Sequence, residues 1–226
     1  MTKTLVHQPE FFPWINLFIK IGYCDFFIFL DSVQYSRRSF QNRNLIGKDG
    51  SFFYITVPIK YCERDTLIKD IKIDNTKSWI EDHIKKFHFC YKKTKFFKPV
   101  INLIETEFYK KYEYLNELNQ GLTKTIAKKM DLKCNFFSST NLSGKGKKTE
   151  IILDLCNKIK ALKYITGTGS KLYLDEEKFK KKQIEINYLE AKSFQYFQEN
   201  SKKKFITNLS IIDYLFNLGF EEFKKK

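Results

Sequence analysis

Polar side chains between positions 7 and 44 fall where apolar runs stop. His7 and Gln8 follow the run "TLV", and Asp31 follows "FFIFL". The next residues, "SVQYSRRSFQNRN", are rich in arginine and amide side chains: Gln34, Arg37, Arg38, Gln41, Asn42, Arg43 and Asn44. Arginine binds phosphate or carboxylate through a bidentate fork, and amides both donate and accept hydrogen bonds. Because Tyr35 and Phe40 stand among these groups, the pattern favours a ligand site over a solvated hairpin.

Two residues of this segment are candidate proton acceptors. The charge of histidine changes near neutral pH, so His7 is a candidate general base. Alternatively, His7 donates a hydrogen bond to a phosphate, or it is a structural histidine. Asp31, at the end of its apolar run, is the second candidate base.

A second candidate site is the stretch "TGTGS", residues 166–170, between an apolar run and a lysine-rich helical pattern. Gly167 and Gly169 would let a ligand approach the backbone closely, and Ser170 adds a hydroxyl. A tight structural turn explains the two glycines equally well. The basic stretch "SGKGKK" fails the phosphate-loop pattern, since Asn141 and Lys148 stand where glycine and Ser/Thr are needed.

The elements that must position these residues alternate between strands and helices. Residues 3–9, 26–31, 51–60, 134–140, 163–167 and 184–190 are typical of strands, with a hairpin turn at Asp49-Gly50 and a short partner strand at 65–74. Helices are predicted at 14–25, 149–159 with Thr149 as N-cap, 171–182 and 208–219, and throughout 76–130. We therefore predict one α/β domain over 1–226: a mostly parallel sheet flanked by helices, with a helical insert at 76–130. Ligands bind such sheets at the carboxyl ends of the strands.

Composition limits the classes of partner and compartment. The formal charge is +15, which suits a polyanionic partner, although lysines spread along helix faces also fit a solvated surface. The five cysteines lack a paired pattern, and no secretory signal or membrane-length apolar run occurs, which predicts reduced thiols in the cytoplasm. The three histidines lack metal-ligand spacing, so no metal site is expected; His83 and His88 are interpreted as surface or core-edge residues.

Four motifs, taken together, resemble the WbqC-like protein family in order and spacing. They are "HQPEFFPW", "FLDSVQYSRRSFQNRN", "YITGTGSKLYL" and "FITNLSIIDYLFNLG", which extend from His7 to Gly219. Phe40 stands where the family often has tryptophan. The resemblance implies a glycine (aminoacyl) or acyl transferase acting on the amine of a nucleotide-linked amino sugar in O-antigen or surface-polysaccharide biosynthesis.

A fainter likeness concerns the fold. A strand followed by His-x-Pro and a late "TGTG" turn resemble the class I nucleotidyltransferase-like architecture. This likeness implies that the protein binds ATP. The double-histidine signature of those proteins is missing, because Trp14 follows Pro13.

The transferase hypothesis gives each candidate residue a role. His7 or Asp31 would be the base, and Gln8, Gln34 or Asn42 would stabilise the oxyanion. The remaining candidates, Tyr35, Arg38, Arg43, Asn44, Gly167, Gly169 and Ser170, would bind the nucleotide sugar. The acyl donor stays open between glycine with ATP, an aminoacyl-tRNA and a carrier thioester. Two alternatives remain: a non-catalytic basic protein that binds nucleic acid or a polysaccharide-assembly partner, and an ATP-using nucleotidyltransferase-like enzyme.

Overall fold

Contacts divide the chain into two compact units. The computed structural model describes residues 2–191, 195–201, 204–221 and 223. The first unit consists of Met1–Gln8, Asn16–Val33 and Leu132–Ser193, and the second of Pro9–Ile15, Gln34–Asp131 and Phe194–Lys226. The boundary at Val33 therefore divides the polar segment 7–44 between the two units.

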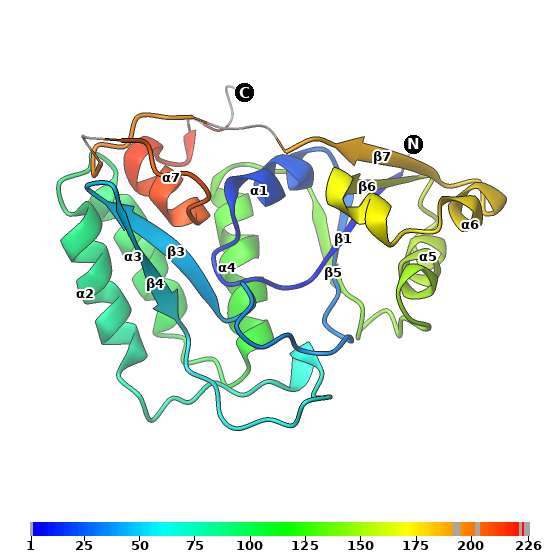
Figure 1. Ribbon diagram of the computed structural model, residues 1–226, viewed down its shortest axis with the longest axis horizontal. Coiled ribbons are helices and arrows are strands. Elements are labelled where there is room, and N and C mark those ends of the chain that lie inside the picture. Colours follow the sequence, from blue (N-terminus) through cyan, green and yellow to red (C-terminus); the bar gives the residue numbers. More distant parts are fainter. Residues whose placement is uncertain (1, 192–194, 202–203, 222, 224–226) are drawn as a thin grey trace. The chain divides into compact units, whose positions relative to one another are not determined.

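A parallel sheet forms the centre of the first unit. Its strands are β1 (Lys3–His7), β2 (Phe26–Phe29), β5 (Asn135–Ser138), β6 (Lys163–Gly167) and β7 (Glu185–Leu189). They lie in the order β5-β2-β1-β6-β7, and every neighbouring pair is parallel (Figure 1). Counted along the sheet, this is the order 3-2-1-4-5 of doubly wound folds. The predicted α/β class with a mostly parallel sheet is confirmed.

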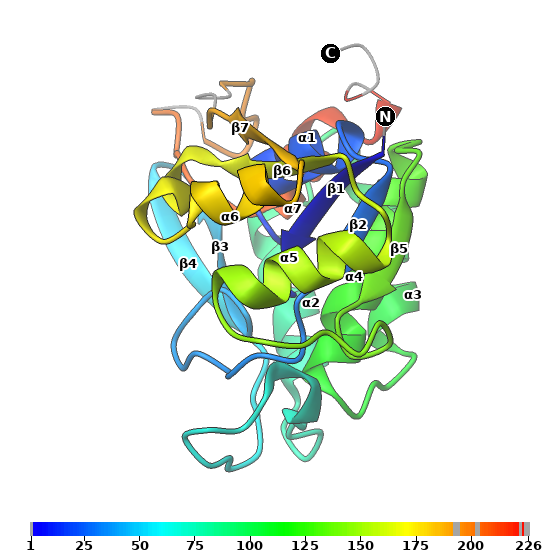
Figure 2. The same cartoon turned by 90° about the vertical axis from the view of Figure 1, so that its right-hand side faces the viewer.

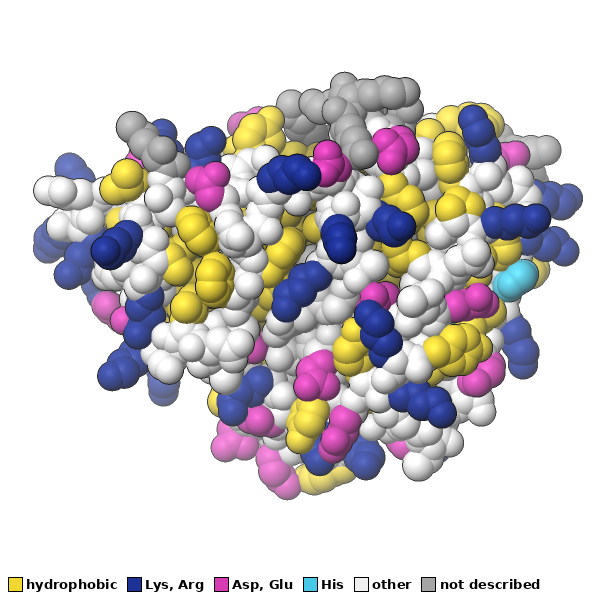
Figure 3. All heavy atoms as spheres, turned by 180° about the vertical axis from the view of Figure 1, so that it is seen from behind, with side chains coloured by type: hydrophobic (Ala, Val, Ile, Leu, Met, Phe, Trp, Pro, Cys, Tyr) yellow, Lys and Arg dark blue, Asp and Glu magenta, His cyan; other side chains and the backbone are white. Residues whose placement is uncertain are grey.

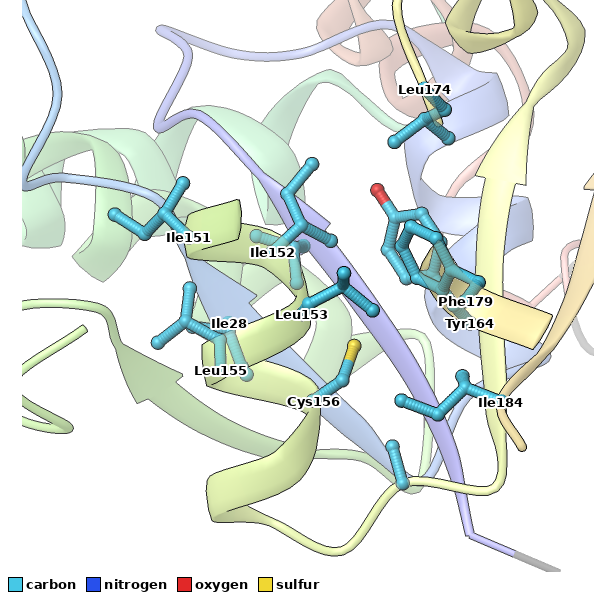
Figure 4. Close-up of a cluster of buried hydrophobic side chains, with 12 residues drawn as sticks. Ile28, Ile151, Ile152, Leu153, Leu155, Cys156, Tyr164, Leu174, Phe179 and Ile184 are labelled. Atoms are coloured by element: carbon cyan, nitrogen blue, oxygen red, sulfur yellow. The ribbon is translucent and has the colours of Figure 1, made fainter. Parts of the chain in front are cut away.

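Helices cover the sheet of the first unit. Helix α5 (Thr149–Lys158) lies across β1 and β2 (Figure 2), and its apolar residues pack against Val6 and Ile28. Helix α6 (Glu176–Lys181) completes this layer, where the rings of Tyr164 and Phe179 stack 5.3 Å apart (Figure 4). The crossovers through α5 and α6 lead along the sheet toward β6 and β7. The crossover through α1 (Ile15–Gly22) leads the other way along the sheet, from β1 to β2. Since such crossovers are right-handed, α1 lies on the other face of the sheet.

The second unit is a hairpin packed with helices. Strands β3 (Arg43–Lys48) and β4 (Ser51–Thr56) are antiparallel, and the predicted turn at Asp49 and Gly50 has positive φ angles of 49° and 84°. The predicted helical stretch 76–130 is confirmed as α2 (Trp79–Tyr91), α3 (Phe97–Phe108) and α4 (Leu115–Lys129). Helix α7 (Ile211–Leu218) ends at Gly219, whose φ of 73° suits the predicted glycine cap.

Three local predictions were wrong. Residues 65–74 form the 3-10 helix η1 (Ile68–Asp70) and isolated bridges where a strand was expected. The helix expected at 171–182 is shorter, because the 3-10 helix η2 (Thr168–Leu172) precedes α6. Thr149 is the first residue of α5 and does not cap it; its hydroxyl bonds instead to Tyr173 O and Asp175 N.

The basic character of the chain is dispersed on the face that Figure 3 shows. Lys and Arg side chains lie scattered over that face with acidic side chains among them, and they do not gather into one patch. Among the described residues, no helix has the length and apolar character needed to cross a membrane. No cluster of His, Cys, Asp and Glu able to hold a metal ion occurs in the described part of the chain.

Candidate functional site

The carboxyl ends of β1 and β6 are neighbours in the first unit. The two strands are paired from Lys3 with Lys163 to Leu5 with Ile165, and His7 and Gly167 each lie two residues further along, at the end of their strand. Neighbouring strands lie about 4.8 Å apart. On either side of this pair the connections leave the sheet in opposite directions, so it marks the topological switch point of the fold. His7 is half-buried there, and Gln8, Thr168 and Gly169 are exposed.

A hydrogen bond defines the tautomer of His7. Nδ1 of His7 lies 2.8 Å from the carbonyl oxygen of Gln8. A carbonyl oxygen only accepts, so Nδ1 carries the proton and donates it. In the neutral imidazole the lone pair is then on Nε2. This is the tautomer that a histidine base needs, with the backbone fixing the orientation of the ring.

The two glycines in the turn after β6 are not explained by backbone conformation or by crowding from described atoms. Gly167 has an ordinary φ of −90°. Gly169 is not one of the described glycines that have a positive φ. A Cβ atom on Gly169 would meet no described atom within 4 Å, and one on Gly167 would meet only Lys20 Nζ, at 4.0 Å. Neither conformation nor packing therefore demands glycine, whereas close approach of a ligand would.

Ser170 holds the turn in shape. Its hydroxyl donates to Gly167 O at 2.8 Å and lies 3.1 Å from Thr166 Oγ1, which donates to it. The side chain of Ser170 is buried, so the Ser170 hydroxyl stabilises the backbone at the switch point. Lys20 of α1, which sequence reasoning missed, adds a cation beside Gly167. Nothing in its local pattern marks it, since its position depends on packing between α1 and β6.

Asp31 connects the ends of β2 and β5. Its Oδ1 accepts hydrogen bonds from Ser139 Oγ (2.8 Å), Thr140 N (2.9 Å) and Thr140 Oγ1 (2.9 Å), and the side chain is only 2% exposed. Ser139 Oγ in turn accepts from the backbone N–H groups of Asp31 and Ser32. Sequence reasoning missed Ser139 and Thr140, although they follow an apolar run just as His7 and Asp31 do.

Gln34, Tyr35 and Arg37 of the second unit bond to one loop. Gln34 Nε2 donates to Arg64 O at 2.6 Å, and Arg37 Nη2 donates to Cys62 O at 2.6 Å. The backbone N–H of Tyr35 bonds to Thr66 O at 2.9 Å. Burial raises the pKa of Tyr35 to about 12, against the opposing effect of the nearby arginines. The hydrogen bonds hold the 34–37 segment on residues 62–66, and burial keeps the Tyr35 phenol neutral.

Arg38 and Arg43 of the same unit contact each other. Arg38 has a positive φ of 58°, and its carbonyl accepts a hydrogen bond from Arg43 Nη2 at 2.5 Å. The guanidinium of Arg43 also lies 4.7 Å from the centre of the Tyr54 ring. Stacking of this kind holds the planar fork in place while leaving its edge for a bidentate partner.

Asn42 and Asn44 support the backbone of the second unit. Asn44 Nδ2 donates to both Phe11 O (3.0 Å) and Phe12 O (2.7 Å), which holds Phe12 at a positive φ of 45°. Asn42 Nδ2 donates to Val57 O at 3.1 Å, and its buried Oδ1 has no hydrogen-bond partner among the described residues. The amide of Asn44 is thus committed to residues 11 and 12.

The candidate residues fall into two groups. Those at the strand ends of the first unit are brought together: His7, Gln8, Asp31, Gly167, Gly169 and Ser170. Those on the loop and hairpin of the second unit form another group: Gln34, Tyr35, Arg38, Asn42, Arg43 and Asn44. Convergence of the two groups on one ligand remains a prediction from the sequence.

The first unit belongs to the class of doubly wound α/β folds with a polar switch point. The chain itself belongs to the WbqC-like protein family, whose sequence model matches residues 8–225, so the resemblance inferred from the four motifs is confirmed. It is 27% identical over 223 residues to the uncharacterized protein Rv1507c of Mycobacterium tuberculosis, a match that covers 98% of this chain and 96% of the relative. No solved structure matches the chain.

Proposed function

We propose that this protein is an aminoacyl or acyl transferase that acylates the amine of a nucleotide-linked amino sugar. The observation that carries the proposal is that β1 and β6, which end at His7 and Gly167, are neighbouring parallel strands at the switch point of the sheet. One residue offers a base with a defined tautomer, and the other offers open backbone for an anion. Doubly wound sheets bind nucleotides at this place.

The base in this proposal is Nε2 of His7. The sugar ammonium gives one proton to Nε2, and the amine nitrogen then forms a bond to the carbonyl carbon of an ester, thioester or acyl phosphate. As the bond to the leaving group breaks, the attacking nitrogen loses a second proton, which the leaving group takes, and Nε2 passes the first proton to solvent. The Nδ1 bond to Gln8 O supports this role, because it stabilises the imidazolium that forms. Asp31 suits the role less well, since its Oδ1 already accepts three hydrogen bonds.

The diphosphate of the nucleotide sugar binds at the turn after β6 in this proposal. The exposed backbone of Thr168 and Gly169 has room for a phosphate, and Lys20 Nζ supplies a cation at its edge. The hypothesis from the sequence also gives Arg38 and Arg43 of the second unit an anion-binding role, which the position of the Arg43 guanidinium over the Tyr54 ring supports.

The hypothesis from the sequence also assigns roles to amide and phenol side chains of each unit. Gln8 is exposed beside the base and would donate to the oxyanion of the tetrahedral intermediate. Gln34, Tyr35 and Asn42 would contact the sugar, and Asn44 would contribute through the loop it holds at Phe11 and Phe12. Neutral donors suit a sugar, whose hydroxyl groups both donate and accept.

A thermal-shift screen tests the proposal without knowledge of the acyl donor. The protein is heated with UDP-N-acetylglucosamine, UDP, dTDP, ATP, glycine and an unrelated oligonucleotide. A ligand at about 100 times its Kd should raise Tm by roughly 5–10 °C. Stabilisation by nucleoside diphosphates or nucleotide sugars, lost in Gly169→Val, is expected. Stabilisation by the oligonucleotide alone, falling steeply as salt rises, would replace the transferase with a nucleic-acid-binding protein.

A further inference from the structure

Two cysteine sulfurs are neighbours at the amino-terminal edge of the parallel sheet. Cys24 lies between α1 and β2, and Cys134 directly precedes β5. Their Sγ atoms are 3.5 Å apart, although 110 positions separate the residues in the chain. The sheet brings them together because β2 and β5 are adjacent and parallel. Both lie at the opposite edge of the sheet from His7 and Gly167.

The backbone beside the two sulfurs is well held. Asn135 N donates to Asp25 O at 2.9 Å, and its side-chain amide donates to the same oxygen at 3.3 Å. Phe26 and Asn135 then begin the paired register of β2 and β5. A disulfide has a sulfur–sulfur distance of about 2.05 Å, so closing the pair needs a movement of roughly 1.5 Å. Side-chain rotation within the loop that carries Cys24 is the simplest source of that movement.

The two thiols differ in access to solvent. Cys24 is 3% exposed, whereas Cys134 is half-buried. The hydrogen bond with Cys134, followed by burial, raises the pKa of Cys24 far above that of an ordinary thiol. A thiolate is the attacking form in thiol–disulfide exchange, so Cys134 reacts first and Cys24 follows.

We propose that Cys24 and Cys134 are an oxidisable dithiol, a modification site for low-molecular-weight disulfides. The Cys134 thiolate attacks one sulfur of the oxidant and releases the first small thiol. Cys24 then loses its proton and attacks the Cys134 sulfur, which releases the second small thiol. Two electrons pass to the oxidant, and the two cysteine protons end on the released thiols.

This disulfide would close a long loop of the chain. The segment between Cys24 and Cys134 contains the whole stretch Gln34–Asp131 of the second unit. A cross-link at both ends of such a segment restricts the unfolded chain, and stabilises most when the loop is long. We expect the oxidised protein to have a Tm roughly 5–10 °C above that of the reduced protein.

Peptide mapping tests the proposal directly on the folded wild-type protein. The protein is incubated with oxidised glutathione, blocked with iodoacetamide and digested with trypsin. The expected product is a cross-link between peptide 21–37 and peptide 134–145, each of which contains one cysteine. The cross-link should disappear on reduction with dithiothreitol, and the intact protein should lose the mass of two hydrogen atoms on oxidation.

Two serine variants distinguish this pair from ordinary exposed thiols. In Cys24→Ser the first step still occurs, so glutathione should stay attached to Cys134. Cys62, which is also half-buried, is the matched control, and Cys62→Ser should form the cross-link as the wild type does. Glutathione that stays on Cys134 in the wild type, or equal labelling of Cys62 and Cys134 without a cross-link, would overturn the proposal.

Discussion

Ser139 Oγ donates a hydrogen bond of 2.8 Å to Asp31 Oδ1, although 108 positions separate the two residues in the chain. The bond joins the carboxyl ends of β2 and β5, two neighbouring parallel strands. The same hydroxyl oxygen accepts hydrogen bonds from the backbone N–H groups of Asp31 and Ser32. One serine thus satisfies the backbone of a strand end and orients the carboxylate that follows it.

Ser139→Ala should lower the free energy of unfolding by about 2–3 kcal/mol. The substitution removes the Ser139 hydroxyl that donates to the buried Asp31 carboxylate, and a hydrogen bond to a charged group is worth about 1.5–3 kcal/mol. Urea unfolding followed by far-UV circular dichroism measures the loss. Ser36→Ala removes an exposed hydroxyl and should change stability by less than about 0.5 kcal/mol. Equal losses of unfolding free energy in both variants would show that the Asp31–Ser139 hydrogen bond contributes no more to stability than an exposed hydroxyl does.

His83 should make the fold sensitive to mild acid. It is buried in α2 against Phe11 and Trp79, and burial, followed by the charge of Lys86, lowers its pKa from 6.5 to about 3. Between these values the unfolded chain binds the proton more readily, so stability falls as pH falls below 6.5. The loss is about 1.4 kcal/mol per pH unit, or roughly 2 kcal/mol between pH 7 and pH 5.

His83→Gln isolates this contribution. Glutamine offers an acceptor for the Thr56 N–H, which bonds to His83 Nε2 at 3.0 Å, but it does not titrate. The variant is less stable at pH 7 because it packs less well against the neighbouring rings. Its own loss between pH 7 and pH 5 should be smaller than that of the wild type by about 2 kcal/mol. Parallel pH dependence in the two proteins would mean that another group causes the acid sensitivity.

Local pattern was sufficient for most elements of the fold. The strand that contains "TLV" and the turn at Asp49-Gly50 depend on only a few neighbouring residues, and both were predicted correctly. His83 was misjudged as a surface or core-edge residue, because its lysine-rich neighbours hide the buried face of α2. The partners of Asp31 could not be predicted, since they depend on which strands become neighbours. Parallel pairing across long loops leaves no signal in a short window of sequence.

The sequence predicted part of the candidate site, as it predicted part of the fold. Ends of strands in one β-α-β unit share an edge, and this rule placed His7 and Asp31 at one edge of the sheet. The division of the chain at Val33 had no counterpart in composition, because no linker marks it. The role of Asp213 in the "NLSIIDYLFNLG" motif was also missed. An acid within an amphipathic helix is read as solvated unless its partners are known.

Asp213→Asn should destabilise the second unit by about 2–3 kcal/mol. The Asp213 carboxylate is fully buried and accepts hydrogen bonds from Tyr196 (2.6 Å), Gln198 (2.9 Å) and Asn200 (3.0 Å). The amide NH2 of asparagine would face one of these donors, which breaks a buried hydrogen bond. Asp82→Asn, at an exposed position of α2, is the control and should have little effect.

The effect of Asp213→Asn should depend on pH. Burial raises the pKa of Asp213 above 3.8, so the folded protein holds this proton more tightly than the unfolded chain. Wild-type stability from this group is therefore greatest in acid and declines as pH rises from 3.8 through the raised pKa. The gap between wild type and variant in urea unfolding should narrow over that range. A gap that widens with pH would contradict a raised pKa.

Gly169→Val should abolish ligand binding at little cost in stability. A Cβ on Gly169 meets no described atom within 4 Å, so the folded protein has room for the side chain. Gly219→Val is the contrasting variant, because Gly219 has a φ of 73° and its Cβ would lie 2.6 Å from Phe96. Melting curves with and without the nucleotide sugar compare the two. If Gly169→Val binds ligand normally but unfolds early, the turn after β6 is structural.

His7→Gln should lower turnover by roughly 10²–10⁴-fold, the usual contribution of general acid–base catalysis. Glutamine keeps much of the side-chain volume and some hydrogen bonding but cannot accept the proton of the sugar ammonium. Substrate affinity should change little, because the proton transfer belongs to the transition state. The measurement is kcat and KM with the nucleotide sugar and acyl donor that the thermal-shift screen and a product assay identify. His88→Gln changes an exposed histidine of α2 and should leave both constants unaltered.

The pH profile of the same variant separates the roles open to His7. If Nε2 is the base, wild-type kcat/KM rises with pH as the imidazole loses its proton, and this rise is absent in His7→Gln. If KM increases while kcat is kept, His7 is a binding contact and Asp31 becomes the candidate base. If only Tm falls, the bond from Nδ1 to Gln8 O serves to hold the end of β1, and His7 is a structural residue.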